Sequence, residues 1–217
     1  MTRKTWWLIV ALIAQIATVA AAQETDLLNA ITASSEALTS YSATIQMTHH
    51  VAHGESIITF SFDFVPADRM SIIYTDPASV SGQTMILNAD KFYTYIPSIN
   101  RRIWQDVDDD SNDQGEELGF LYDFVIRAAA TFIDINPIEG PSTIESYVLE
   151  GSGTTIDVTK FAFQVDDGQQ VVWVNQVDAV PVAVDLYDGD DLVMEVRVLE
   201  YRANEPIDDS AFVIPDK

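Results

Sequence analysis

Ser42-Ala-Thr-Ile-Gln-Met-Thr-His49 alternates apolar and polar residues, and residues 55–65 repeat that alternation after a short break. On one side the two runs carry Ala43, Ile45, Met47, Ile58, Phe60, Phe62 and Phe64. Successive side chains of a strand point to opposite faces, so both runs predict strands with one apolar face. His53-Gly54 lies between them and predicts a hairpin turn.

The same period of two continues along most of the chain. It predicts further strands at 69–75, 82–88, 91–96, 101–105, 146–150, 154–165, 170–175, 182–187 and 192–201. Gly- and Asp-rich turns at 151–153, 166–168 and 188–190 separate the later strands. The pattern predicts a largely antiparallel sheet of about ten strands.

Two segments have helical spacing instead, 25–40 before the first strand and 118–132 midway. A sheet of this size tends to curl, and its apolar face must be covered. We therefore expect an α+β fold, in which a curled antiparallel sheet forms an incomplete barrel of about ten strands covered by helices. Whether the interior of such a barrel is filled or hollow cannot be read from periodicity.

The first 22 residues have the layout of a secretory signal peptide. Arg3 and Lys4 precede an apolar run at 6–19, and Ala20-Ala21-Ala22 ends it with small residues. The run is short for a membrane span, although an uncleaved anchor is the alternative. We expect 1–22 to be removed and 23–217 to form a single exported domain.

Composition excludes some partners. The chain holds 34 Asp and Glu against 11 Lys and Arg, a formal net charge of -23. Such a body repels nucleic acid and anionic lipid surfaces, so no nucleic-acid partner is expected. The charge favours solubility, and the alternative is an acidic surface that meets a basic partner. With no cysteine, the chain has no disulfide and no lipid attached through a lipobox.

No catalytic motif is present in the sequence. There is no Cys nucleophile, no G-x-S-x-G and no glycine-rich phosphate loop. His49, His50 and His53 cluster in five residues, but a metal site needs a further ligand from elsewhere, and a polar strand end is the simpler interpretation. We expect a protein that is not an enzyme and binds no cofactor and no metal, with an esterase as the remote alternative.

The acidic loop 106–117 resembles a calcium loop in spacing. Its oxygen-bearing residues Asp106, Asp108, Asp110, Asn112 and Glu117 fall at positions 1, 3, 5, 7 and 12. Ser111 stands where the sharp turn requires glycine, so we expect an inert, solvated loop. Calcium binding is the alternative.

Three blocks resemble the LolA/LolB/RseB superfamily of periplasmic lipoprotein-handling proteins. They are Phe62-Asp-Phe-Val-Pro66-Ala-Asp-Arg69-Met, Leu87-Asn-Ala-Asp-Lys-Phe-Tyr-Thr-Tyr95-Ile-Pro97 and Asn204-Glu-Pro-Ile207-Asp-Asp-Ser-Ala-Phe212-Val-Ile-Pro215. Their order and spacing, after a signal peptide and a leading helix, span essentially the mature chain. The arginine that many LolA proteins place just before the turn proline is Val65 here.

The resemblance implies an incomplete barrel around an apolar cavity that is closed by helices and binds acyl chains without catalysis. We expect a monomeric carrier or chaperone for acyl chains of lipoproteins or lipids, with a membrane-bound donor or acceptor protein as partner. The resemblance also implies secretion across the inner membrane into the periplasm or cell envelope. A lipid- or lipoprotein-sensing module on the same fold is the alternative. The expected cavity residues are Phe60, Phe62, Phe64, Tyr95, Phe163, Trp173, Leu121 and Val125.

Overall fold

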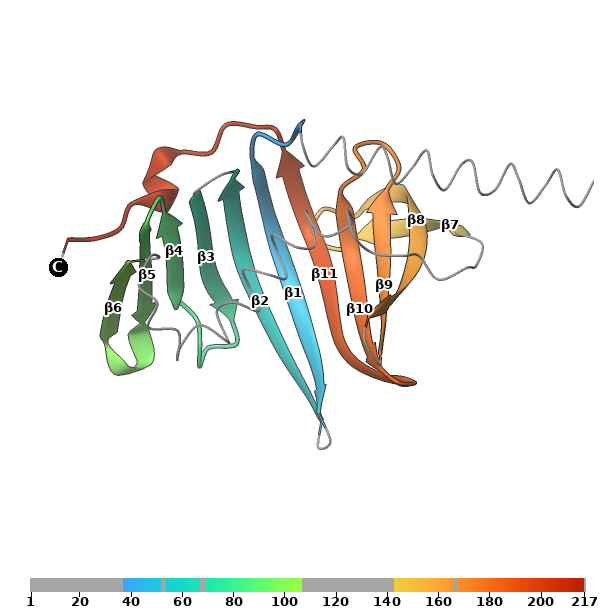
Figure 1. Ribbon diagram of the computed structural model, residues 1–217, viewed down its shortest axis with the longest axis horizontal. Helices are drawn as coiled ribbons and strands as arrows, with labels where there is room; N and C mark the ends of the chain where they lie inside the picture. Colours follow the sequence, from blue (N-terminus) through green and yellow to red (C-terminus); the bar gives the residue numbers. More distant parts are fainter. Residues whose placement is uncertain (1–36, 52–53, 67–68, 107–142, 166–167, 217) are drawn as a thin grey trace, which may run out of the picture.

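A computed structural model describes residues 37–51, 54–66, 69–106, 143–165 and 168–216, and within these it gives no side-chain account of 163–165. They form one antiparallel sheet of 11 strands in the order β6-β5-β4-β3-β2-β1-β11-β10-β9-β8-β7 (Figure 1). The strands are β1 (Tyr41–Val51), β2 (Gly54–Val65), β3 (Arg69–Asp76), β4 (Thr84–Asn88), β5 (Lys91–Ile96), β6 (Arg101–Asp106), β7 (Thr143–Leu149), β8 (Thr154–Val165), β9 (Gly168–Asn175), β10 (Pro181–Asp188) and β11 (Asp191–Ala203).

The strand order leaves the sheet open, with β6 and β7 as its two end strands and the chain's first and last strands paired in the middle. The β7 end of the sheet curls back, because the Gly151 N–H donates to the Leu199 carbonyl of β11 at 2.9 Å. A Cβ at position 151 would lie 3.0 Å from that oxygen, so this close approach favours glycine. The predicted curled antiparallel sheet is confirmed as an open sheet.

The expected covering helices are not seen in the part of the chain that the structure describes. Its helical elements are two short 3-10 turns, η1 (Pro97–Ile99) and η3 (Asp209–Phe212). The predicted helix 118–132 and most of 25–40 lie outside the described residues. The latter was wrong at its end, because the Ser40 carbonyl accepts from the Asn204 N–H at 2.9 Å, which holds the entry to β1 extended.

Cross-strand register aligns one continuous row of buried apolar side chains. Phe62 pairs with Ala43 on one side and Ile72 on the other, and Ile72 then pairs with Met85. We call the face that carries this row the apolar face. Its buried members are Ala43, Ile45, Met47, Phe60, Phe62, Met70, Ile72, Tyr74, Met85, Leu87, Phe161, Val172, Val174, Val182, Val184, Met194, Val196 and Val198.

The closing segment 204–216 crosses from the end of β11 to the ends of β3 and β4 (Figure 1). Phe212 is buried there, and its carbonyl accepts from Asn88 Nδ2 at 2.9 Å. The Arg69 guanidinium stacks over the Phe212 ring and donates to Asp209 Oδ1 at 2.7 Å. Arg69 therefore fastens the end of the chain to the sheet, on the face opposite Met70.

Candidate functional site

The apolar face in β1–β5 is built around the rings of Phe60 and Phe62, and both residues are only 1% exposed. An exposure this low leaves no water-sized space against either ring. Phe64 continues the row but is only partly buried, and its ring lies 6.1 Å from that of Phe62. The row thus runs from a closed centre to a partly open end.

Flexible side chains surround these rings. Met47, Met70 and Met85 come from β1, β3 and β4, and all are buried on the apolar face. Methionine is unbranched with three rotatable bonds, so it adapts to gaps of irregular shape. Sequence reasoning missed these residues, although the alternation placed Met47 on the correct face. Their joint position depends on strand pairing that spacing within one strand does not give.

Valine dominates the same face in the other half of the sheet. Its buried members there are Val172, Val174, Val182, Val184, Val196 and Val198, with Phe161 and Met194. Branching at Cβ restricts χ1, so this half packs with stiff side chains that fit a pleated surface. The apolar face therefore has an adaptable half and a rigid half.

Two expected cavity residues lie on the opposite face. Trp173 pairs with Lys160 and Ala183, and neighbours the apolar-face residue Val172 in sequence. Tyr95 pairs with Arg102, whose guanidinium lies 5.7 Å from its ring centroid. Neither side chain is in the row that contains Phe60 and Phe62.

The side chains of the remaining three expected cavity residues lie outside what the structure describes. Phe163 lies in β8 opposite Gln170, and its side chain is outside what the structure describes. Leu121 and Val125 also lie outside the described residues. Their place in a cavity stays a prediction.

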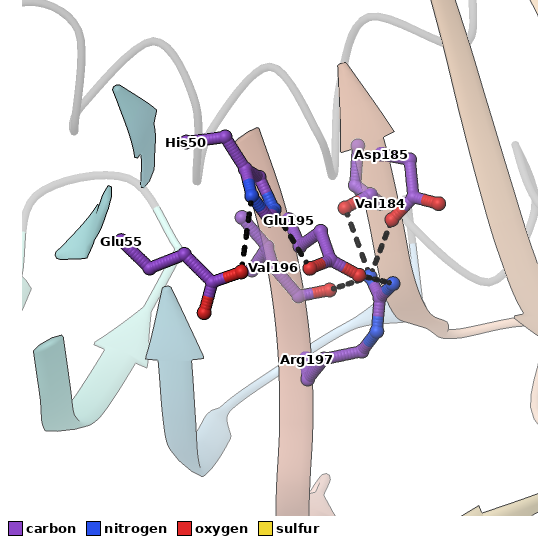
Figure 2. Close-up of polar contacts among 7 residues, drawn as sticks. All are labelled: His50, Glu55, Val184, Asp185, Glu195, Val196 and Arg197. Carbon is purple, nitrogen blue, oxygen red and sulfur yellow. Dashed lines mark hydrogen bonds and ion pairs between the residues drawn. The ribbon is translucent and has the colours of Figure 1, made fainter. Parts of the chain in front are cut away.

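A charged cluster occupies the face opposite the apolar row, at the centre of the sheet (Figure 2). Arg197 Nη2 donates to Glu195 Oε1 at 2.5 Å, and Nη1 lies 2.6 Å from Asp185 Oδ1. The Nη1 hydrogens are directed to the carbonyls of Val184 and Val196, at 3.2 and 3.0 Å. Asp185 is therefore ion-paired without an aligned hydrogen bond at that oxygen.

His50 extends the cluster across β1. Its Nε2 lies 2.9 Å from Glu195 Oε2, and its Nδ1 lies 3.5 Å from Glu55 Oε1. Lys160 Nζ and the Arg197 guanidinium both lie over the Trp173 ring, at 4.9 and 5.5 Å. Ion pairs and hydrogen bonds of the cluster link β2, β1, β11 and β10, and the two cations over Trp173 add β8 and β9, which is a structural role.

The structure describes only part of the histidine cluster and of the acidic loop 106–117. His49 and His50 are neighbours on one strand and so point to opposite faces, and His53 is outside the described residues. Within the described ranges, no three His, Cys, Asp or Glu residues are placed to hold a metal ion. Of the loop 106–117, only Asp106 is described, at the end of β6.

A second set of hydrogen-bonded polar side chains lies at one end of the apolar face. Tyr201 donates to Asp178 Oδ2 at 2.5 Å and accepts from Asn175 Nδ2 at 2.6 Å, and its ring stacks on Tyr41 at 5.9 Å. Burial raises the pKa of both tyrosines, and the Asp178 carboxylate adds to this for Tyr201. Both phenols therefore stay protonated at neutral pH.

Two solved structures match the fold of this chain. MucB matches with a TM-score of 0.55 and 11% identity, covering 89% of this chain and 63% of MucB. LprF from Mycobacterium bovis matches with a TM-score of 0.51 and 11% identity, covering 88% and 95% of the two chains. The fold is shared with MucB and LprF.

A LolA superfamily protein from Nitrosomonas europaea aligns more loosely, with a TM-score of 0.42, 14% identity and coverage of 88% and 97%. No family model and no curated protein matches the sequence. In the described part of the chain, no helix has the length and apolar character needed to cross a membrane. The matches to MucB and LprF establish the fold, and the superfamily that the sequence resembles is represented by name among the structural neighbours.

Proposed function

We propose that the protein is an exported, non-enzymatic carrier that shields the acyl chains of a lipoprotein or lipid on its apolar face. The observation that carries this proposal is the buried row from β4 to β8, which contains no charged side chain although the chain as a whole has a net charge of -23. Each methylene removed from water is worth about 0.8 kcal/mol, so acyl chains need such a surface to cross an aqueous compartment.

Cargo entry requires the face to open. Phe60 and Phe62 contact no open space, so an acyl chain must displace whatever side chains cover them. The partly buried Phe64 and Ile58 mark where the row is accessible first. We further propose that 1–22 is a cleaved signal, that 23–217 acts as one monomeric domain in the envelope, and that a membrane-bound protein donates or accepts the cargo.

The alternative is a sensor on the same fold. MucB has been solved in complex with MucA(peri), and that structure matches with a TM-score of 0.50, 12% identity and coverage of 86% of this chain and 58% of MucB. A carrier transfers its cargo to an acceptor, whereas a sensor changes its affinity for a partner when lipid binds. Transfer of a fluorescent fatty acid to acceptor vesicles separates the two.

Native mass spectrometry of protein purified from its own envelope tests the proposal, since cargo appears as added mass. A displacement assay with a fluorescent fatty acid then compares Phe64→Gln with Ile73→Gln, which changes a partly exposed residue on the opposite face of β3. We expect Phe64→Gln to weaken binding and Ile73→Gln to leave it unchanged. No bound mass and no displacement in the wild type would reject the carrier function.

A further inference from the structure

One buried hydroxyl on the apolar face has only a weak partner. Tyr74 is 8% exposed, and its ring lies 5.7 Å from that of Phe60. Its hydroxyl donates to the Met85 sulfur at 3.9 Å. Among the described residues this sulfur is the only acceptor that the hydroxyl reaches, and a thioether is a weak acceptor. Burial also raises the pKa of Tyr74, which keeps the hydroxyl protonated as a donor.

Such a hydroxyl is costly to bury for packing alone. A phenylalanine at position 74 would fill the same volume without leaving a polar group poorly satisfied. The other aromatic residues of the buried row in β2, Phe60 and Phe62, carry no hydroxyl. The Tyr74 hydroxyl can therefore take a better acceptor than the Met85 sulfur.

The position of Tyr74 fits an amphipathic ligand. Its backbone carbonyl accepts from the Gly82 N–H at 2.8 Å, at the turn that joins β3 to β4. Tyr74 thus lies near one end of the apolar face, while Phe62 and Ile72 lie further along the same row. A ligand with an oxygen at Tyr74 would extend its hydrocarbon chain along the phenylalanine and methionine side chains.

The acceptor side of the present bond is adaptable. Met85 belongs to the methionine-rich half, so its side chain can rotate away from the hydroxyl at little cost. Valine, which fills the other half, has a single side-chain torsion and offers no such movement. Exchange of one acceptor for another is therefore compatible with the packing around Tyr74.

We propose that the cargo site is in the β1–β4 part of the apolar face, and that the Tyr74 hydroxyl exchanges its bond to the Met85 sulfur for an ester or carboxyl oxygen of the cargo. This rests on the proposed carrier function. It restricts the ligand class to chains that carry an oxygen acceptor near one end.

Displacement of diphenylhexatriene by methyl palmitate and by heptadecane tests the proposal, because the two probes have similar chains and only one has an ester. We expect the wild type to prefer the ester. Tyr74→Phe should lose about threefold to tenfold in ester affinity, the worth of one hydrogen bond, with alkane affinity unchanged. Met85→Leu should keep or improve ester binding, since the hydroxyl then has no bond to give up.

Tyr93→Phe is the matched control, since Tyr93 is also buried but pairs with Trp104 on the opposite face. It should leave both affinities unchanged. Equal affinity of wild type and Tyr74→Phe for the ester, or an equal loss for ester and alkane, would overturn the proposal while the carrier function stands. Failure of the wild type to bind either probe would instead reject the carrier function itself.

Discussion

The two halves of this sheet share one topology but are packed with different chemistry. In β1–β5, the buried apolar face carries Phe60, Phe62 and three methionines beside Ile45 and Ile72, and no valine is buried among those described strands. In β8–β11, valine fills most of the equivalent positions. The difference separates an adaptable region, suited to admit a ligand, from a rigid region that holds the fold.

The largest expected effect is on stability in the adaptable half. Phe62→Ala should lower the free energy of unfolding by about 3–5 kcal/mol, because it removes a buried ring. Val172→Ala in the rigid half should cost about 1.5–3 kcal/mol, since fewer buried atoms are lost. Urea denaturation of both variants measures this, and a smaller loss for Phe62→Ala would show that the ring is not closely packed.

The charged cluster is expected to stabilise the centre where the halves meet. Arg197→Gln leaves the Asp185 carboxylate, 9% exposed, without its cation. Because the Arg197 side chain is 26% exposed, we expect a loss of about 1–3 kcal/mol, below that for a fully buried pair. Arg202→Gln on the same strand breaks only an exposed pair and should change stability by less than about 0.5 kcal/mol. Equal unfolding midpoints for the two variants would contradict this role.

The difference in packing also predicts how well each half tolerates a change in side-chain volume. Met70→Leu, which nearly conserves volume, should cost less than about 1.5 kcal/mol. Val172→Leu adds a methylene among stiff neighbours and should cost about 1–3 kcal/mol. Thermal melts of the two variants compare the halves directly. If Met70→Leu is the more destabilising, the adaptable half is more tightly specified than we infer.

The smallest expected effect concerns the closing segment 204–216, which contacts β3 and β4. Hydrogen bonds from the Ser210 side chain and from the Ser210 N–H, the latter at 2.8 Å, lower the pKa of the Asp208 carboxyl below its usual range. The stability that the ionised Asp208 adds to the folded protein is therefore present above the unfolded pKa of about 3.9. It is lost as pH falls through the lower pKa of the folded state. Asp208→Asn should flatten the dependence of Tm on pH below about 4. An unchanged slope would exclude this contribution.

Most of the sheet could be predicted from the sequence because alternation with period two is a local property. Every predicted strand has a counterpart, although β7 begins at Thr143 rather than 146. The alternation also placed Phe60, Phe62 and Phe64 on the apolar face. It could not show that Tyr95 and Trp173 belong to the other face, because register between strands is set by pairing.

Contacts between residues that are far apart in the chain could not be predicted from local sequence patterns. The bond from Tyr74 to Met85 joins neighbouring strands, and Arg69 meets Asp209 across 140 positions of the chain. In the loop 106–117, the spacing of oxygen-bearing residues suggested a calcium site. The structure describes only the first residue of this loop, so calcium binding stays untested.

The most direct test of the adaptable half as the cargo site is NMR of protein labelled on the methionine methyl groups. The chain has five methionines, of which Met1 is in the predicted signal, so few resonances need assignment. On titration with palmitate, we expect the methyl signals of Met47, Met70 and Met85 to shift with a common affinity, and that of Met194 to shift least. Saturable palmitate binding with those three signals unmoved would contradict the proposal.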